Sequence, residues 1–540
     1  MGKYLNNKNA FELYKQEVLK PYFIDKTDMI EELLYVVNGA SNCICIIRPR
    51  RFGKTMIANM LTSYFSKGCD TSTIFNKLHM KNSEYYKEHL NTHHVIHIDF
   101  SQIPMPCNSY NEYITRIVHS LIEDLKTQFP NVVFSKEDAL WDILDKIYFQ
   151  YSEKFIFILD EWDAVFHMKF ITTAEKNQYL SFLKALLKDK AYVFFAYMTG
   201  ILPIAKYSSG SELNMFLEYT MVTEEKFSEY FGFTELEVDE LYERYLTKAK
   251  KINITREGLR DWYNGYHTKS GKRMYNPRSV VTALINNNLG NYWTNSGPYD
   301  EIYFYVNKNV DAVRDDIASM IAGIPVRTKI REYAATSMNL TTKSEIFSAM
   351  VVYGFLSFEN GDVSIPNREL MDKFNEMLQK EESLGYVYQL AKESERMIEA
   401  TKMGDTTTMI QILEFAHNTE LPILRYNSEE SLSALVNLVY LSARDYYFVE
   451  REDKAGIGYV DYIFKPMVNS NDDCIIIELK VDSTPEDAIK QIKEKQYALK
   501  FEGMLGETRK YKGRILAVGI SYDKQSKKHE CKIEILRNKC

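Results

Sequence analysis

Residues 43–55 read CICIIRPRRFGKT, a short apolar run followed by a basic loop and the triplet Gly53-Lys54-Thr55. The apolar run predicts a buried strand, and the residues after Lys54 carry apolar side chains on one helical stripe. A bound nucleotide needs backbone N–H groups at a helix N-terminus, a lysine near its β- and γ-phosphates and a hydroxyl for magnesium. The order of strand, loop and helix therefore predicts a phosphate-binding loop, although Arg48 stands where such loops usually carry their first glycine.

Further apolar runs indicate that this loop belongs to a parallel sheet. Runs rich in β-branched and aromatic residues occur at 95–100, 155–159 and 193–198, with helical segments between them. Buried strands that alternate with helices are typical of α/β proteins with a mainly parallel sheet. We therefore expect an N-terminal α/β unit that ends near residue 220.

Acidic and hydroxyl side chains follow the last two of these runs. Asp160 and Glu161 come directly after the first of the two, and Thr199 comes after the second. Carboxylates at the tip of a neighbouring strand can hold the magnesium ion of a nucleotide and activate water. We expect Asp160 and Thr55 to bind magnesium and Glu161 to act as the base. The Thr199 hydroxyl is expected between the sheet and the γ-phosphate.

Composition limits the class of protein. The chain has 540 residues and a mass of 63.2 kDa, enough for three or four domains of roughly 150 residues. Hydrophobic residues make up 45% and charged residues 26%, which excludes wholesale disorder. No apolar run approaches the roughly 18 residues of a membrane helix, and no apolar signal core opens the chain, so we expect a cytoplasmic protein with no membrane partner. The net charge of −7 excludes a coat of basic surface but leaves room for a local nucleic-acid groove.

Two changes in sequence pattern predict three domains. The α/β unit is expected to cover residues 1–222. Long charged amphipathic helices, such as 235–251 and 381–402, fill residues 223–424 and predict a helical lid and connector. From residue 425 to 540 short apolar strands return, which predicts a second α/β domain of about 110 residues.

The pattern of this last segment is α-β-β-α-β. Thr484, with Pro485 after it and Asp487 three residues on, marks a capped helix start. The expected elements are a helix at 429–444, strands at 458–464 and 474–480, a helix at 486–500, and strands at 514–520 and 532–536.

Two carboxylates and a lysine lie on neighbouring strands of this predicted domain. Glu478 and Lys480 are two residues apart at the end of one strand, so they share a face, and Asp461 on the preceding strand can meet them. Two carboxylates can bind magnesium, which polarises a phosphodiester and activates water, and a nearby ammonium can position that water. The pair also fits an ordinary exposed strand end, or a nuclease-derived domain that binds nucleic acid without cutting it.

The N-terminal motifs together resemble the bacterial AAA-ATPase-like family. That family also uses an Arg-Pro-Arg-Arg-Phe-Gly-Lys loop without the first glycine. The resemblance spans most of residues 10–370 and implies a P-loop NTPase sheet with a helical lid that binds ATP and Mg²⁺. The segments that carry it are Arg48–Thr55, Val95–Ser101, Leu159–Asp163, Thr199–Ile201 and Phe231–Thr234. The residues it implies for nucleotide binding are Arg48, Pro49, Arg50, Arg51, Phe52, Gly53, Lys54, Thr55, Asp160 and Thr199.

The C-terminal motif resembles the PD-(D/E)XK nuclease superfamily, in the small restriction-endonuclease-like domain that follows the AAA-like module in the same bacterial family. Asp461, Glu478 and Lys480 match its catalytic set, with magnesium on the two carboxylates. The next helix matches the glutamine and tyrosine that accompany this core, at Gln491, Ile492 and Tyr497. Glu430 matches an additional acidic residue of the family, with Glu429 a near-equal candidate. Tyr459 departs from the arginine common in relatives.

The leading hypothesis is an ATP-dependent, magnesium-dependent nuclease that acts on DNA. The resemblance suggests a role in defence or in mobile elements, which the residues themselves do not address. The competing hypothesis is a regulatory ATPase switch whose nuclease-like domain only binds nucleic acid or a partner. A third is a nucleotide-dependent scaffold that assembles without turnover, and a homo-oligomer is left open. The last 35 residues hold ten Lys and Arg against four Asp and Glu, which is weak support for DNA binding.

Overall fold

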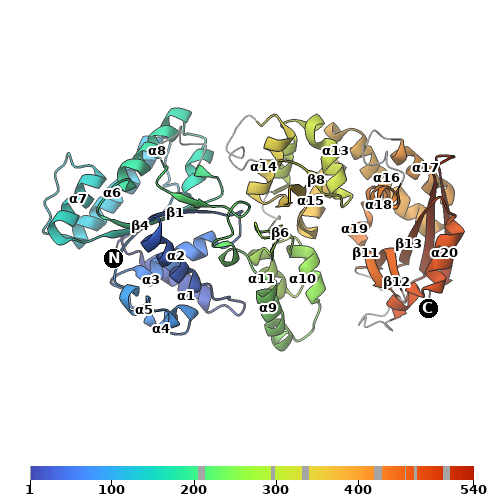
Figure 1. The fold of residues 1–540 in the computed structure, drawn as a ribbon, viewed down its shortest axis with the longest axis horizontal. Helices are drawn as coiled ribbons and strands as arrows, with labels where there is room; N and C mark the ends of the chain where they lie inside the picture. The colour runs from blue at the N-terminus through green and yellow to red at the C-terminus, as the bar shows by residue number, and fades with distance from the viewer. Residues whose placement is uncertain are drawn as a thin grey trace. The chain divides into compact units, whose positions relative to one another are not determined.

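The computed structural model describes residues 2–204, 213–293, 298–330, 340–418, 428–455, 458–467, 471–502 and 511–539. The chain forms two compact units (Figure 1). The first comprises Met1–Asn295, Lys329–Leu340 and Ser344–Gly361, and the second comprises Ser296–Thr328, Thr341–Lys343 and Asp362–Cys540. Residues 223–424 are thus shared between the two units, and the expected boundaries at 222 and 424 stay predictions.

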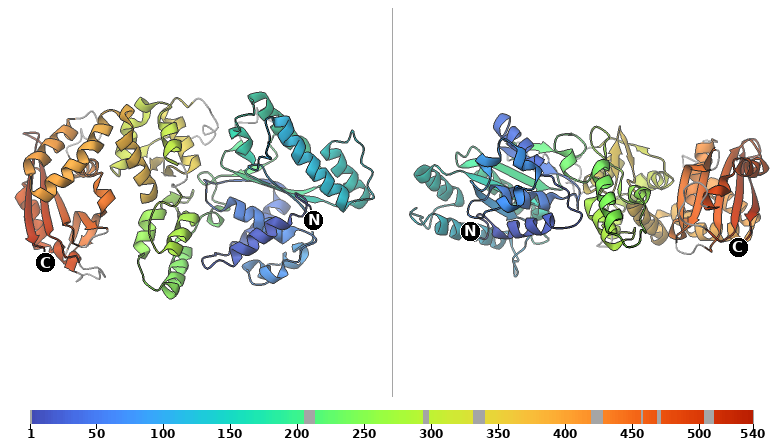
Figure 2. Two further views of the ribbon diagram at one scale, coloured as in Figure 1. Left: turned by 180° about the vertical axis from the view of Figure 1, so that it is seen from behind. Right: turned by 90° about the horizontal axis from the view of Figure 1, so that it is seen from below.

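The first unit is built on a five-stranded sheet in the order β2-β3-β4-β1-β5, in which every paired strand is parallel. Helices α1 to α3 lie on one face and α6 to α8 on the other (Figure 2). Its strands are β1 (Cys43–Ile47), β2 (His94–Asp99), β3 (Phe155–Asp160), β4 (Val193–Gly200) and β5 (Leu217–Tyr219). Its first helices are α1 (Lys8–Val18), α2 (Asp28–Gly39), α3 (Lys54–Phe65), α4 (Ser72–Phe75), α5 (Tyr86–His89), α6 (Tyr110–Gln128), α7 (Leu140–Tyr151) and α8 (Thr173–Leu187).

The strand order explains where the first site lies. β1 and β3 flank β4, so the carboxyl ends of these three parallel strands meet at one edge of the sheet. The strand cores are fully buried apolar runs, which confirms the expected α/β unit with a parallel sheet. β5 was not expected from the sequence, because a three-residue edge strand leaves almost no pattern.

A smaller helical group follows the sheet in the same unit. It packs around its own apolar cluster, which includes Tyr22 and Ile24 from the N-terminal segment. Its elements are α9 (Glu235–Lys248), α10 (Arg256–Tyr263), β6 (Tyr266–His267), β7 (Arg273–Met274) and α11 (Pro277–Asn286). The segments α14 (Lys343–Tyr353) and β9 (Ser357–Glu359) complete the unit.

The second unit combines helices with a five-stranded mixed sheet in the order β11-β12-β13-β14-β15. Only β13 and β14 pair in parallel. The strands are β11 (Tyr447–Ala455), β12 (Gly458–Pro466), β13 (Cys474–Val481), β14 (Ile515–Asp523) and β15 (Lys528–Arg537), with the short pair β8 (Val326–Arg327) and β10 (Asp362–Ser364) elsewhere. The helices are α12 (Pro298–Val306), α13 (Val310–Ile321), α15 (Arg368–Lys380), α16 (Tyr386–Met403), α17 (Thr406–His417), α18 (Glu429–Val439), α19 (Ala443–Tyr446) and α20 (Pro485–Glu494).

The second sheet differs from the expected α-β-β-α-β pattern by one strand. β11 adds an edge strand before β12, in a stretch that reads as charged loop. The expected helix start at Thr484 is confirmed. The Thr484 hydroxyl accepts from the Asp487 N–H, and the Asp487 side chain accepts from the Thr484 N–H. The helix at 486–500 was expected too long, since α20 ends at Glu494 and a 3₁₀ turn, η9 (Tyr497–Glu502), follows.

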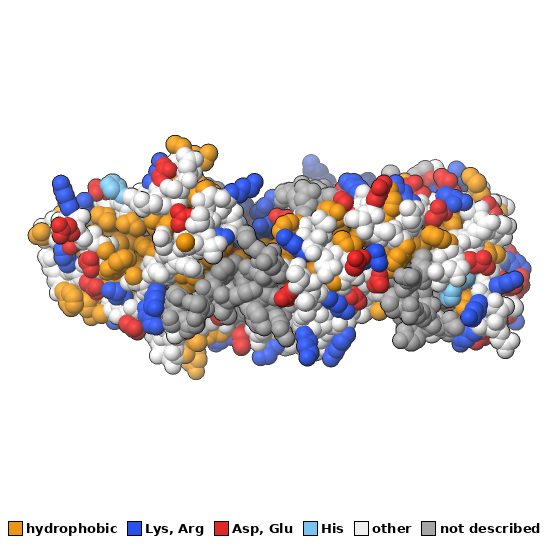
Figure 3. Space-filling model, turned by 90° about the horizontal axis from the view of Figure 1, so that it is seen from above, with side chains coloured by type: hydrophobic (Ala, Val, Ile, Leu, Met, Phe, Trp, Pro, Cys, Tyr) orange, Lys and Arg blue, Asp and Glu red, His pale blue; other side chains and the backbone are white. Residues whose placement is uncertain are grey.

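Side chains of both charge signs are interspersed on the face of the molecule in Figure 3. Among the described residues, none of the helices combines the length and apolar composition needed to cross a membrane.

Candidate nucleotide and nuclease sites

The loop between β1 and α3 leaves room for an anion. Gly53 precedes α3 with φ 89°, and Arg51 has φ 69°, so two loop residues adopt the left-handed conformation. A Cβ at Gly53 would meet no atom within 4 Å, and this residue provides no side-chain cap for α3. The first N–H groups of a helix need such a partner, so they suit a phosphate here.

The Lys54 ammonium is held inside the loop. Its side chain is only 4% exposed, and Nζ donates to the carbonyl oxygens of Arg48 at 3.3 Å and Pro49 at 3.2 Å. Glu161 Oε1 lies 3.9 Å from the same nitrogen. The expected lysine and the expected base therefore face each other across the strand tips.

Three carboxylates gather beside this lysine at the ends of β2 and β3. Asp99 and Asp160 are register partners in the parallel pair, and Glu161 follows with a left-handed φ of 49°. Burial raises the pKa of Asp160 to about 7, and the charge of Glu161 adds to that rise. Burial also raises the pKa of Glu161, while the Lys54 ammonium opposes the rise. Asp99 was not singled out in the sequence; its only signal was its position at the end of a predicted neighbouring strand.

The residues at this edge fit a magnesium ion. Asp160 is fully buried, and its Oδ2 has no hydrogen-bond partner among the described residues. A hydrogen bond from Thr55 acts to lower the pKa of the same carboxyl group. Thr199 Oγ1, at the end of β4, is also buried and lacks a hydrogen-bond partner within the part of the chain that the structure describes. Buried oxygen atoms left without partners are costly unless a cation or ligand completes them.

The side chains of the loop contact other segments of the first unit. Arg48 is buried; it donates to the carbonyl oxygens of Ile47 at 2.7 Å and Tyr219 at 2.9 Å and lies over the Phe231 ring. This guanidinium therefore ties the loop to the edge strand β5. Arg48 was expected to contribute to nucleotide binding. In this geometry its backbone carbonyl could do so indirectly, because it accepts a hydrogen bond from the Lys54 ammonium.

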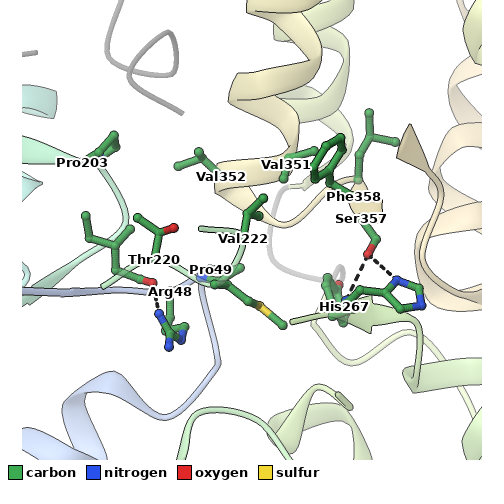
Figure 4. Close-up of a pocket in the computed structure, with 14 residues that line it drawn as sticks. Arg48, Pro49, Pro203, Thr220, Val222, His267, Val351, Val352, Ser357 and Phe358 are labelled. Carbon is green, nitrogen blue, oxygen red and sulfur yellow. Dashed lines mark hydrogen bonds between the residues drawn. The ribbon is translucent and has the colours of Figure 1, made fainter. Parts of the chain in front are cut away.

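The next loop residues contact the segment after α14. A Cβ on Gly354, whose φ is 84°, would lie 2.7 Å from Pro49 Cβ, and Arg50 lies over the Tyr353 ring at 6.0 Å. A cavity of about 30 Å³ lies beside these contacts (Figure 4). Its lining includes Pro49, Thr220, Val222, His267, Val352 and Ser357.

Phe52 and Arg51 complete the loop contacts. Phe52 is buried edge-on against Tyr266 at 4.9 Å between ring centroids. Arg51 is largely exposed, but partial loss of water around its guanidinium, together with the positive charges of Arg278 and Arg50, lowers its pKa. Arg278 lies in the first turn of α11 and was not singled out in the sequence.

The second candidate site lies between β12 and β13. The antiparallel pairing of Tyr462 with Ile477 sets Asp461 opposite Glu478. Asp461 Oδ2 accepts the Leu479 N–H at 2.7 Å. The expected juxtaposition of the two carboxylates on adjacent strands is thus present in the sheet.

Glu478 is the most unusual group of this site. It is 3% exposed, its Oε1 accepts from Gln491 and from Lys480 Nζ at 3.4 Å, and its Oε2 is buried without a partner among the described residues. Burial raises the pKa of Glu478 to about 7, and the charge of Asp461 adds to the rise. A cation would complete this oxygen atom, so the pair fits Mg²⁺. No group of three or more His, Cys, Asp or Glu in the described ranges is arranged to hold a metal, so water or substrate would fill the other positions.

The helix α20 brings the expected glutamine to Glu478. Gly519 is the β14 partner of Glu478, and a Cβ there would lie 2.3 Å from the Pro485 carbonyl oxygen. Only glycine allows α20 to approach the sheet so closely, and this contact could not be predicted from the sequence. Tyr497 is buried beside the site and hydrogen-bonds with Gln491.

The remaining nuclease-motif residues contribute less to this geometry. Ile492 is fully buried in the core between α20 and the sheet. Glu430 lies exposed in the first turn of α18, and within the described structure no hydrogen bond or ion pair joins it to Asp461 or Lys480. The Tyr459 side chain lies outside the described residues.

Two protein-family models match the chain, one in each of the segments that contain a candidate site. Residues 11–209 match the family model described as "Predicted AAA-ATPase", in the AAA-ATPase-like family. Residues 428–530 match the model of the PD-(D/E)XK nuclease superfamily. The two matched ranges contain the phosphate loop with its acidic strand tip and the Asp461–Glu478 pair. A search of curated proteins found no match.

Solved structures include distant matches. The Walker-type ATPase PABY2304 of Pyrococcus abyssi is 10% identical, with 64% of this chain and 93% of that chain covered and a TM-score of 0.37. The ORC2 protein of Aeropyrum pernix, in its ADPNP–ADP complexes, is 12% identical, with 66% and 93% covered and a TM-score of 0.34.

Proposed function

Because the chain joins an AAA-ATPase-like domain to a PD-(D/E)XK nuclease superfamily domain, we propose that it hydrolyses ATP in the first and cleaves DNA in the second. One observation carries the nuclease assignment. Glu478 is buried opposite Asp461, and one of its carboxylate oxygens has no hydrogen-bond partner among the described residues. Such an arrangement destabilises the fold, and a bound cation would offset that cost.

In the proposed ATPase, different side chains at the strand tips contact the phosphates, accept the proton and bind the metal. The Lys54 ammonium contacts the β- and γ-phosphates, and the Thr199 hydroxyl donates to the γ-phosphate. Glu161 accepts the proton as water attacks the γ-phosphorus, and the bond to the bridging oxygen breaks to give ADP and inorganic phosphate. Thr55 and Asp160 would hold Mg²⁺, which supplies positive charge to the phosphoryl oxygens. The elevated pKa of Glu161 suits a proton acceptor.

In the proposed nuclease, Asp461 and Glu478 would hold Mg²⁺, which polarises the phosphodiester. Lys480 orients the attacking water, and its ammonium offsets negative charge as the P–O bond breaks. Gln491 donates to Glu478 Oε1, so Oε2 is the oxygen that would bind the ion. A role in defence or in mobile elements is part of the proposal and rests on the family resemblance. A cytoplasmic location is also part of the proposal and rests on the sequence pattern alone.

The decisive experiment is a cleavage assay on the full chain. Purified protein is incubated with labelled plasmid and linear duplex, with Mg²⁺ and with or without ATP. Asp461→Asn, Glu478→Gln and Lys480→Ala should each abolish cleavage and leave ATP hydrolysis intact. Lys490→Ala, which removes an exposed lysine of α20, serves as the control and should cut normally.

Two outcomes would overturn the proposal. If the wild type cuts neither DNA nor RNA while it binds them, the second domain is a binding module of a regulatory ATPase. If the wild type cuts and Glu478→Gln cuts equally well, the active site lies elsewhere.

A further inference from the structure

A fourth carboxylate near the strand tips, besides Asp99, Asp160 and Glu161, hydrogen-bonds to the segment that follows β4. Asp163 lies in the 3₁₀ turn η2 (Trp162–His167) that follows β3, and it is 1% exposed. Its Oδ2 accepts the backbone N–H groups of Ile201 at 3.0 Å and Leu202 at 2.8 Å. One side chain therefore joins the turn after β3 to the segment that leaves β4.

The two segments are packed as tightly as glycine permits. A Cβ on Gly200 would lie 2.4 Å from Asp163 Oδ1 and 2.6 Å from the Trp162 ring. The Trp162 carbonyl in turn accepts from the Tyr179 hydroxyl at 2.9 Å, which anchors the turn to α8. Asp163 is thus fixed on one side by α8 and holds the β4 exit on the other.

This geometry separates Asp163 from the proposed proton acceptor. Glu161 lies 3.9 Å from the Lys54 ammonium, whereas the hydrogen bonds of Asp163 go to the β4 exit. Asp163 Oδ1 is buried without a partner in the described part of the chain, against Gly200 and the Trp162 ring. A carboxylate placed there holds the backbone of the β4 exit through these two hydrogen bonds.

We propose that Asp163 is the positioning residue that couples Thr199 to Glu161. Thr199 immediately precedes the Gly200–Leu202 segment that Asp163 holds, and Glu161 lies two residues before Asp163 in the turn after β3. A γ-phosphate contact at Thr199 therefore fixes Glu161 through this clamp. The role rests on the proposed ATP hydrolysis and adds to it the element that aligns the base.

Substitutions at Asp163 separate the clamp from proton transfer. Asp163→Ala removes both hydrogen bonds and should lower kcat for ATP roughly 10–100-fold, while the Kd for ATP changes less than threefold. Asp163→Asn keeps an oxygen that accepts from both N–H groups but cannot take a proton from water, so it should restore kcat to within a few-fold of wild type. Loss of turnover in Asp163→Asn with ATP binding intact would make Asp163 the proton acceptor and overturn the clamp.

A second variant tests the contact from the other side. Gly200→Ala keeps the Asp163 side chain but adds a Cβ that would push its carboxylate away from the β4 exit. It should lower kcat as Asp163→Ala does, again with little change in ATP affinity. A wild-type kcat in both variants would overturn the proposal.

Amide hydrogen exchange provides a readout that needs no nucleotide. In the apo protein, Asp163→Ala should accelerate exchange of the Ile201 and Leu202 amides at least tenfold, and Asp163→Asn should not. Glu137→Ala, which removes an exposed carboxylate of the same unit, is the control. If the wild type fails to hydrolyse ATP, the proposed ATPase is wrong, but the exchange rates still decide whether the clamp exists. Unchanged exchange in a folded Asp163→Ala protein would disprove it.

Discussion

Glu478→Gln should stabilise the metal-free protein at alkaline pH, although it destroys the proposed metal site. The side chain is 3% exposed, its Oε2 lacks a partner in the described structure, and Asp461 faces it across the strand pair. An ionised carboxylate in this position is destabilising, whereas a neutral amide of the same shape is not.

The size of the effect follows from the pKa. The Glu478 carboxyl has a pKa of about 7 in the folded chain against an ordinary value of 4.5. Between these two values the folded state binds more protons than the unfolded state, so stability falls as pH rises through this window. At about 1.4 kcal/mol per pKa unit, the loss approaches about 3 kcal/mol above pH 7, and glutamine avoids it. For a unit of this size that corresponds to roughly 6–12 °C in melting temperature.

Thermal unfolding in the presence of EDTA measures this difference. At pH 8 the Glu478→Gln protein should melt above the wild type, and at pH 5, where Glu478 is protonated, the two should melt alike. Glu530→Gln removes an exposed carboxylate of the same sheet and should follow the wild type at both pH values. Addition of Mg²⁺ at pH 8 should raise the melting temperature of the wild type and leave Glu478→Gln unchanged.

A particular result would refute this reasoning. If Glu478→Gln lowers the melting temperature equally at pH 5 and pH 8, the carboxylate is already satisfied by Lys480 and Gln491. The unpaired oxygen would then say nothing about a metal ion.

Three further variants test the first unit. Lys54→Ala removes the ammonium held in the loop and should weaken ATP binding by at least about 1.5–3 kcal/mol; calorimetry that finds unchanged affinity in the folded variant would exclude the site. Glu161→Gln should keep ATP binding and lose roughly 10²–10⁴-fold in turnover, and a wild-type rate would move the base elsewhere. Gly354→Ala adds a Cβ 2.7 Å from Pro49 at a positive φ, so it should cost about 1–3 kcal/mol of stability and weaken ATP binding. The control Gly39→Ala, with open space around it, should change neither. Equal melting temperatures for the two variants would show that Gly354 does not support the loop.

The sequence predicted the strands that are buried on both faces and the edge strands β2 and β15, but it missed the edge strands β5 and β11. β1, β3 and β4 are continuous apolar runs because helices cover both sides of the sheet. β5 is only three residues long, and β11 contains the charged run Glu450–Lys454. An edge strand can carry charges that a central strand cannot, so its residues resemble those of a loop.

The candidate sites show the same division. Spacing predicted that Glu478 and Lys480 share a face and that Asp461 on the neighbouring strand can meet them, and the antiparallel pairing in the structure sets Asp461 opposite Glu478. Spacing could not show that Asp163 binds the β4 exit or that Gly519 admits α20, since each depends on two segments far apart in the sequence. Roles set by packing, unlike roles set by strand position, need the tertiary structure.

The phosphate loop shows how such packing can replace a sequence rule. Glycine at the first position normally lets the loop turn sharply, and this chain has Arg48 there. The Arg48 side chain binds the Tyr219 carbonyl, Pro49 fits against Gly354, and Phe52 packs on Tyr266. Contacts from three separate segments thus hold the loop in the shape that a glycine would otherwise permit. Arg48, Pro49 and Phe52 are then structural supports, and the proposed phosphate contacts fall to the loop backbone, Lys54 and the start of α3.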